Sequence, residues 1–139
     1  HVPALNNYIP TDFSLRCDDD HVMSEEEREA SHKEYPTLLQ EDKNFRMWHK
    51  KDCFWRVPKT FIRLSLISPH TYESPRAMTL SRIYQRVLND DLNSFVYDAS
   101  IAGCNYRISC APSGYKMSVS GYSEKLPFLL DTLTTRMLS

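Results

Sequence analysis

The amino-acid sequence predicts an α+β fold in which helices pack on one face of a mostly antiparallel sheet. Three observations support this prediction. Residues 59–67 alternate apolar and polar side chains as a strand does, residues 74–100 repeat apolar side chains at helical spacing, and residues 104–122 alternate again on both sides of a turn. A second helical pattern begins near residue 126. The expected order is three strands, a long helix, two strands and a helix.

Length and composition fit one folded domain. The chain has 139 residues, of which 41% are hydrophobic and 25% charged, as expected for a globular protein with its own core. It begins on His1 rather than on a methionine and ends at Ser139 within a helical pattern. We therefore expect a fragment of a longer protein.

Residues 1–44 are predicted to form an inter-domain linker with an acidic loop. The stretch "NNYIPTDFSL" has few periodic apolar positions, so we expect extended chain lying on a surface. Residues 18–29, "DDDHVMSEEERE", contain seven acids and one arginine. A short solvated helix over residues 25–30 and a disordered loop both fit this acidic run.

Order is expected to begin near Phe45, so residues 45–139 are interpreted as the folded part. Two aromatic-rich segments flank the polar "KKD" in "FRMWHKKDCFWRVP", which predicts a hairpin. In the following strand, "TFIRLSLIS", the side chains of Ile62, Leu64 and Leu66 share one face. Phe61 and Ile67 add apolar surface to the other face, which we expect to be partly covered as well.

The stretch from Ser74 to Ser100 predicts one long helix. Ser74 can cap its N-terminus, and Pro75 fits the first turn, where its missing N–H costs nothing. Gly103 is a plausible stop signal. The expected buried stripe consists of Leu80, Ile83, Tyr84, Val87, Leu88, Leu92, Phe95 and Ala99.

A strand pair and a last helix complete the pattern. The segments "CNYRISC" and "YKMSVSGY" alternate on either side of the turn "APSG". Ser123 is the expected cap of the last helix, and Pro127 lies in its first turn. Its expected apolar face consists of Leu126, Leu129, Leu130, Leu133 and Met137.

Charge and cysteine usage exclude several classes of protein. Outside residues 18–29 the chain carries 16 basic and 11 acidic side chains, a mild excess that can attract acidic peptides but lacks the dense basic stripe of a nucleic-acid-binding protein. No apolar run approaches the roughly 20 residues that span a bilayer. Four cysteines without C-x-x-C spacing predict free thiols in a reducing compartment, with packing roles for Cys104 and Cys110.

Several groups of reactive side chains are candidates for a catalytic or peptide-binding site. His49, Asp52 and Cys53 resemble a nucleophile group, but they fall on the expected hairpin without an identifiable oxyanion hole, so an accidental grouping is the better interpretation. Adjacent carboxylates on a helix, such as Asp90 and Asp91, point in different directions and fit a solvated face. Tyr72 and Tyr97 are candidates for packing or for contact with a peptide.

Several blocks of sequence, in order, resemble one known family. "NNYIPTDFSL", "MWHKKDCFWRVPK", "LSLISPHTYESP", "LNSFVYDASIAG" and "SVSGYSEKLP" are similar to segments of the insulin-degrading enzyme and pitrilysin group, the insulinase family of zinc metallopeptidases. The resemblance covers residues 6–15 and about 44–139, and leaves the acidic insertion unmatched. It implies a truncated domain of the metallopeptidase-like, ferredoxin-type repeat fold, namely the first half of the third, non-catalytic domain.

The resemblance also implies where zinc is and is not held. In this family an H-x-x-E-H helix of the first domain binds the metal, with glutamate activating water. By order of elements, residues 80–84 replace that turn and read "LSRIY", whose leucine, isoleucine and tyrosine cannot hold zinc. The single histidine of "SHKEY", His32, has no partner four residues away. We therefore expect no catalytic, cofactor-binding or metal-binding residue in this chain, and zinc in the parent enzyme.

The resemblance implies a structural role within a peptide-degrading enzyme. We expect the chain to form part of a substrate-enclosing chamber of a cytoplasmic zinc metalloendopeptidase, with the catalytic N-terminal half of the parent chain and peptide substrates as partners. Nucleic acid and membrane are not expected partners. A binding or assembly module of a catalytically inactive, processing-peptidase-like relative is the alternative. The truncated apolar face also predicts marginal stability or self-association.

Overall fold

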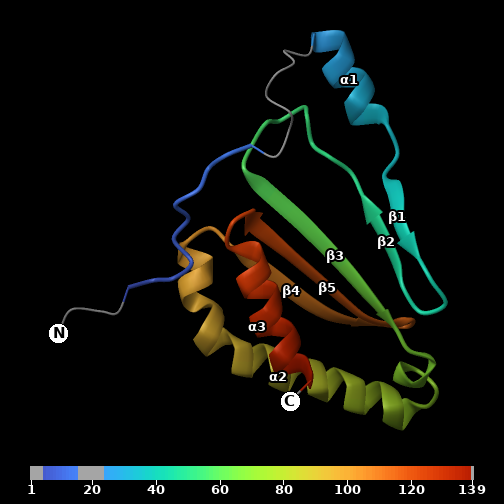
Figure 1. Ribbon diagram of the computed structural model, residues 1–139. Helices are drawn as coiled ribbons and strands as arrows, with labels where there is room; N and C mark the ends of the chain where they lie inside the picture. Colours follow the sequence, from blue (N-terminus) through green and yellow to red (C-terminus); the bar gives the residue numbers. More distant parts are fainter. Residues whose placement is uncertain (1–4, 16–23, 139) are drawn as a thin grey trace. The chain divides into compact units, whose positions relative to one another are not determined.

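The structure, a computed structural model, describes residues 5–15 and 24–138 (Figure 1). The chain divides into two compact units. The larger unit contains the described parts of His1–Phe13 and Lys59–Ser139, and the smaller unit those of Ser14–Pro58.

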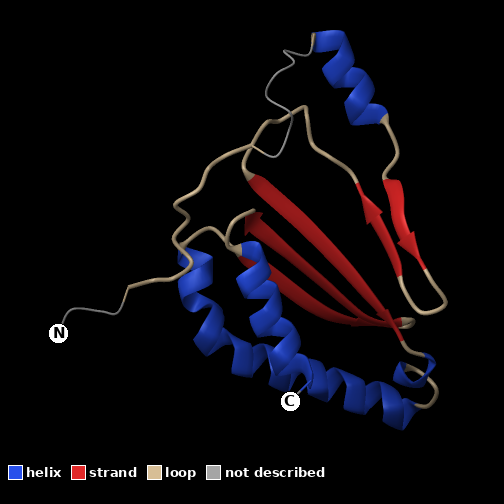
Figure 2. Ribbon diagram, in the orientation of Figure 1, coloured by secondary structure: helices blue, strands red, loops and turns tan. Residues whose placement is uncertain are grey.

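The larger unit is built on a three-stranded antiparallel sheet. Its strands are β3 (Lys59–Ile67), β4 (Asn105–Ala111) and β5 (Gly114–Tyr122), in the order β3-β5-β4 (Figure 2). Ile62 is paired with Val119 and Leu64 with Met117, so these side chains share one face. On β4, Tyr106 and Ile108 take the positions opposite Val119 and Met117. This face of the sheet lines one side of the core. The strands predicted within residues 59–67 and 104–122 are therefore confirmed.

The tight β4–β5 turn requires a glycine at its end. Only Pro112 and Ser113 separate the two strands, and Gly114 follows with φ +130°. A Cβ atom at this position would collide with the carbonyl oxygen of Leu66 on β3. Gly114 therefore allows β5 to pass close to β3 where the strand begins.

Two helices cover the same face of the sheet (Figures 1 and 2). Helix α2 (Pro75–Ile101) follows the short 3₁₀ helix η1 (Pro69–Thr71), and α3 (Leu126–Leu138) follows β5. As predicted, the Ser74 side chain caps α2 by accepting a hydrogen bond from the Ala77 N–H at 3.1 Å, and Gly103 follows the helix end with φ +80°. The α+β prediction is thus confirmed. The core that the helices share with the sheet consists of Tyr8, Leu88, Leu92, Val96, Ala99, Cys104, Ile108, Met117, Val119, Leu126, Leu129 and Leu133.

The buried face of α2 differs from the predicted stripe. Leu88, Leu92 and Ala99 are buried as expected, and Val96, which the prediction omitted, is buried with them. Leu80 and Ile83, in contrast, are 55% and 52% exposed, and Tyr84, Val87 and Phe95 are also exposed. The reason is geometric. Helix α2 packs against β4 and α3 only through a narrow stripe of every third or fourth residue. The other apolar side chains of the helix lie outside this stripe and remain exposed.

Two further expectations for the larger unit are wrong. Phe61 and Ile67 on the second face of β3 are 76% and 83% exposed rather than partly covered, and Leu66 is also exposed. The Ser123 hydroxyl forms a hydrogen bond with that of Thr60 at 2.8 Å, and α3 begins three residues later. The apolar face of α3 agrees with the prediction, since Leu126, Leu129 and Leu133 are buried and Leu130 and Met137 pack beside them.

The smaller unit contains a helix and a two-stranded sheet. Helix α1 (Glu25–Lys33) has a capping box in which the Ser24 hydroxyl accepts from the Glu27 N–H and the Glu27 carboxylate accepts from the Ser24 N–H. This confirms the helical alternative for the acidic run, within its described part. Strands β1 (Thr37–Glu41) and β2 (Arg46–His49) pair antiparallel.

The hairpin predicted within residues 45–58 is wrong. Strand β2 pairs with the preceding β1, not with the segment that follows "KKD", so order in this unit begins before Phe45. The Asp52 carboxylate explains the difference, because it accepts hydrogen bonds from the N–H groups of Phe54 and Trp55 and folds that segment into a turn. Arg56, with φ +50°, interrupts the extended chain again.

No helix in the described part of the chain is both long enough and apolar enough to cross a bilayer. Cys53, Cys104 and Cys110 are free thiols, Cys104 being buried in the core, while Cys17 lies outside the described residues.

Candidate functional site

The α2 turn from Leu80 to Tyr84 is joined to α3 and β5 through hydrogen bonds. The Tyr84 hydroxyl donates to the carbonyl oxygen of Met137 on α3 at 2.7 Å, and its ring packs edge-on against Tyr115 of β5 at 5.7 Å. The Ser81 carbonyl accepts from the Tyr115 hydroxyl at 3.3 Å. Partial desolvation of its hydroxyl first, and then the neighbouring Tyr115, raise the pKa of Tyr84, so the hydroxyl remains a donor at neutral pH although the residue as a whole is 40% exposed. This turn is a junction between elements.

Gln85, one residue further along α2, binds the edge of the sheet. Its side-chain N–H₂ donates to the Ile108 carbonyl at 3.3 Å, and its side-chain oxygen accepts from the Cys110 N–H at 3.1 Å. A peptide group of a neighbouring strand would make the same pair of bonds. The Gln85 amide therefore closes this part of the β4 edge.

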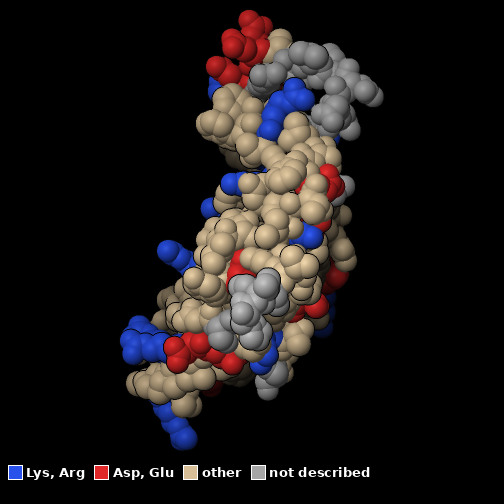
Figure 3. All heavy atoms as spheres, turned by 90° about the vertical axis from the view of Figure 1, so that its left-hand side faces the viewer, with Lys and Arg blue, Asp and Glu red and all other residues tan. Residues whose placement is uncertain are grey.

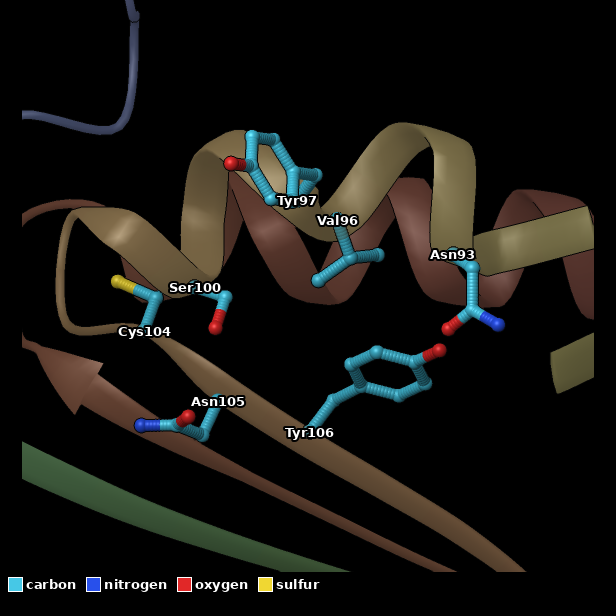
Figure 4. A pocket seen from close by; sticks show the side chains of 7 residues that line it. All are labelled: Asn93, Val96, Tyr97, Ser100, Cys104, Asn105 and Tyr106. Atoms are coloured by element: carbon cyan, nitrogen blue, oxygen red, sulfur yellow. The ribbon is translucent and has the colours of Figure 1, made fainter. Parts of the chain in front are cut away.

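A pocket of about 360 Å³ lies beyond Gln85 along the same side, between the last turns of α2 and the start of β4 (Figure 4). In Figure 4 the side chains of Asn93, Val96 and Ser100 point from the helix towards β4, and the Tyr106 ring lies below them with its hydroxyl near Asn93. Burial raises the pKa of Tyr106, which therefore stays protonated and able to donate. The lining residues are Asn93, Val96, Tyr97, Ser100, Cys104, Asn105 and Tyr106.

The chemistry of this pocket is that of a neutral hydrogen-bonding surface. Its amides and hydroxyls can donate to and accept from a neutral polar group. Carboxylate, imidazole, ammonium and guanidinium groups are not among the side chains that line it. Sequence reasoning missed Asn93, Asn105 and Tyr106 because neutral polar residues on a helix and a strand carry no distinctive spacing. Tyr97 was singled out, and it lies 67% exposed at the pocket.

A second polar cluster attaches the N-terminal segment to the rest of the larger unit. The Glu124 carboxylate accepts hydrogen bonds from the backbone N–H groups of Thr11 at 2.7 Å and Asp12 at 2.8 Å, and from the Thr11 hydroxyl at 3.1 Å. Lys125 forms an ion pair with it at 2.8 Å. The Asp12 N–H, then Lys125 and the Thr11 N–H, lower the pKa of Glu124 from its ordinary 4.5 to about 2.

Aromatic contacts support the same attachment. Tyr8 is buried against the Phe128 ring at 5.2 Å, and Phe13 packs edge-on against Tyr122 at 5.5 Å. The Asn6 side chain donates to the Asp98 carbonyl at the end of α2 at 2.8 Å. The prediction of extended surface chain is wrong for the start of this segment, because Asn7, Tyr8 and Ile9 form a turn and Tyr8 is part of the core. Glu124 was missed because its partners are more than 100 residues away in the sequence.

The remaining candidates have local structural contacts. The Asp52 carboxylate accepts hydrogen bonds from the backbone N–H groups of Phe54 and Trp55 and so stabilises the turn in which they lie. Asp91 forms an ion pair with Arg136 at 3.8 Å. His32, from "SHKEY", stacks on Phe54 with ring centroids 5.0 Å apart.

Figure 3 shows charges of both signs among the described residues, in small groups of Lys and Arg and of Asp and Glu on a mostly uncharged surface. Within residues 5–15 and 24–138, no three His, Cys, Asp or Glu side chains lie together as a group that could hold a metal ion. The turn Leu80–Tyr84 does not fit zinc either: two of its side chains are hydrocarbon, and the Tyr84 hydroxyl is bonded to Met137.

Comparison with known proteins defines the class as a domain of a peptidase family. Residues 1–139 match the family described as "Middle or third domain of peptidase_M16". The chain therefore belongs to this family, which confirms the resemblance noted in its sequence.

The chain covers only a small share of the length of the proteins it is similar to. The chain is 34% identical over 137 residues to insulin-degrading enzyme-like 1, peroxisomal, of Arabidopsis thaliana, covering 99% of this chain and 13% of that protein. It is 30% identical over 136 residues to insulin-degrading enzyme of Bos taurus, covering 98% and 12%. The crystal structure of pitrilysin matches with a TM-score of 0.80 at 24% identity, covering 100% of this chain and 14% of that one, and supports the fold.

Proposed function

We propose that this chain is a non-catalytic structural domain of a zinc metalloendopeptidase of the insulin-degrading type. In this proposal it forms part of the wall of a chamber that encloses peptides, and the parent enzyme degrades them with zinc held elsewhere. The family match and the printed names of the relatives support this function. The observation that carries it is the α2 turn, where the Tyr84 hydroxyl donates to the Met137 carbonyl and the Ser81 carbonyl accepts from the Tyr115 hydroxyl, so that this turn joins structural elements.

We also propose the domain limits suggested by the sequence. Residues 1–44 would connect the domain to a preceding half of the parent chain, and residues 45–139 would form the first half of the non-catalytic domain. The extended segment held by Glu124 supports a connecting role for the start of the chain. The natural partners would be the rest of the parent chain and its peptide substrates, in the cytoplasm. Imaging of the tagged parent protein tests the compartment.

The upstream coding sequence tests the proposal against its alternative. We expect an H-x-x-E-H helix several hundred residues before His1, and we expect the parent protein to hydrolyse unfolded peptides in a chelator-sensitive way. A parent sequence without any zinc motif would assign the chain instead to an inactive, processing-peptidase-like binding or assembly module.

A further inference from the structure

The outer face of the β3-β5-β4 sheet, which turns away from α2 and α3, has an unusual charge distribution. The strand register sets its membership, because residues that alternate with the core positions Ile62, Leu64, Met117 and Val119 must point to the opposite side. Basic residues occupy four of these positions: Lys59, Arg63, Arg107 and Lys116. The other outer positions on the three strands hold serines, Asn105, Tyr122, small residues and two apolar side chains, and no acid.

Three of the basic residues are close neighbours in the middle of this face. Arg63 and Arg107 both pair with Ser118 on the central strand, from either side, and Lys116 lies two residues before Ser118. With strands about 4.8 Å apart, the Cα atoms of Arg63 and Arg107 lie roughly 10 Å from one another. All three side chains are exposed. Like charges this close raise the local affinity for an anionic group that can lie between them.

Exposed apolar side chains flank the basic centre along β3. Phe61 and Ile67 are 76% and 83% exposed and both belong to the outer face. They are six positions apart along the strand, which corresponds to about 20 Å. The outer face therefore presents apolar, basic, hydroxyl and apolar side chains at the alternate positions Phe61, Arg63, Ser65 and Ile67, with Lys116 directly opposite Ser65.

We propose that the outer sheet face is a docking surface for an extended acidic peptide whose side chains alternate as apolar, acidic, acidic, apolar. An extended peptide repeats its side chains at the spacing of β3, so its two apolar residues would contact Phe61 and Ile67 while its two carboxylates reach Arg63 and Lys116. Arg107 adds positive charge beside the first carboxylate. This inference rests on the proposed function, since it names a class of peptide that a chamber wall would hold.

A peptide fits this face better than a nucleic acid does. Single-stranded nucleic acid is held by a continuous basic groove with aromatic side chains on which successive bases stack. Here three basic residues are grouped in the centre, and the apolar positions hold one phenylalanine and one isoleucine at a distance of about 20 Å. The central basic residues and the spacing of the two apolar side chains together fit an extended acidic peptide.

Binding of a labelled peptide to the 139-residue chain tests the proposal. The probe is Leu-Ser-Glu-Ser-Glu-Ser-Leu with a fluorophore at one end, measured by anisotropy at low salt. We expect saturable binding that weakens as sodium chloride rises from about 50 to about 500 mM, because screening shortens the range of the charges. The glutamine peptide Leu-Ser-Gln-Ser-Gln-Ser-Leu and the inverted peptide Glu-Ser-Leu-Ser-Leu-Ser-Glu should each bind about tenfold more weakly.

Two charge-reversal variants locate the surface. Arg63→Glu with Lys116→Glu should weaken binding about tenfold or more, because like charges then face the peptide. Arg82→Glu with Arg86→Glu, at two exposed positions on α2, makes the same change in net charge and should leave binding within about twofold. If circular dichroism shows that the sheet variant is disturbed, Arg63→Gln with Lys116→Gln replaces it.

The contradicting results are equally specific. Equal loss in both variants would show general attraction between charges, and equal binding of the inverted peptide would remove the role of Phe61 and Ile67. A single-stranded oligothymidylate that displaces the acidic probe at lower concentration than the unlabelled peptide would assign the face to nucleic acid. None of these results depends on the zinc motif upstream. A result that contradicts peptide docking therefore leaves the proposed function untouched, and the reverse also holds.

Discussion

At the scale of single residues, Glu124 connects the most distant parts of the sequence. One carboxylate accepts from two successive backbone N–H groups and one hydroxyl of the N-terminal segment while Lys125 compensates its charge. Hydrogen bonds to an ionised acceptor are roughly twice as strong as those between neutral groups. This geometry makes the attachment of residues 11 and 12 dependent on ionisation.

Acid should therefore release the N-terminal segment. Because the folded carboxyl of Glu124 has a pKa of about 2, below the ordinary 4.5, the stabilisation is complete above about pH 4.5 and disappears as pH falls towards 2. The measurement is an NMR titration of the Glu124 carboxyl together with amide exchange at Thr11 and Asp12. Glu124→Gln should abolish the protection of both amides at neutral pH, and Glu73→Gln, which removes only a surface pair with His70, should not. An ordinary titration midpoint would contradict the assigned geometry.

Gly114 is the second residue on which the fold depends directly. Gly114→Ala would place a Cβ against the Leu66 carbonyl in a left-handed backbone conformation. We expect the free energy of unfolding to fall by more than about 2 kcal/mol, since strain and steric collision add. Urea unfolding measures the change, with Ser113→Ala in the same turn as the control. A loss as small as that of the control would mean that β5 does not pass so close to β3.

At the scale of elements, α2 shows what periodicity can and cannot predict. Its existence, cap and end follow from Ser74, Pro75 and Gly103, which act through the local backbone. Which apolar stripe is buried depends on where β4 and α3 lie, and no local pattern contains that information. The same reasoning explains why the β4–β5 hairpin was predicted and the pairing of β1 with β2 was not: the aromatic pattern indicated a strand near Trp48 but not its partner.

Matched truncations on α2 test the corrected stripe. Leu92→Ala should lower the free energy of unfolding by about 2–5 kcal/mol, because it leaves a cavity in a site with no exposed surface. Leu80→Ala, at a side chain that is 55% exposed, should cost roughly 0.5 kcal/mol. Chemical denaturation of both variants provides the comparison. Equal losses would restore the broader stripe expected from the sequence.

The pocket beside β4 shows why a functional site is harder to predict from the sequence than a helix or strand. Its amides and hydroxyls come from the end of α2 and the beginning of β4, and they meet only because Gly103 reverses the chain between those elements. At residues 80–84, by contrast, the residue types alone show that Leu80 and Ile83 offer no ligand atoms for zinc. A property that depends only on side-chain type can be predicted from the sequence. A pocket that forms where two elements meet in the fold cannot.

At the scale of the whole molecule, exposed apolar side chains on β3 predict association. Phe61 and Ile67 on the outer face of β3, and Leu66 on the opposite face, leave apolar area in water, at a cost of roughly 25 cal/mol per Å². We expect the 139-residue chain to form dimers or larger species as its concentration rises, measured by sedimentation velocity. Phe61→Ser with Ile67→Ser should shift the distribution towards monomer. A wild-type chain that stays monomeric and heat-resistant at high concentration would contradict this expectation.

The central claim is that this domain supports a peptidase without performing its chemistry. The direct measurement is hydrolysis of an unfolded peptide by the purified 139-residue chain, followed by mass spectrometry, with zinc added or chelated and with bound zinc determined by elemental analysis. We expect no cleavage and less than stoichiometric zinc in every condition. Cleavage that a chelator stops and zinc restores, together with one zinc ion per chain, would contradict it.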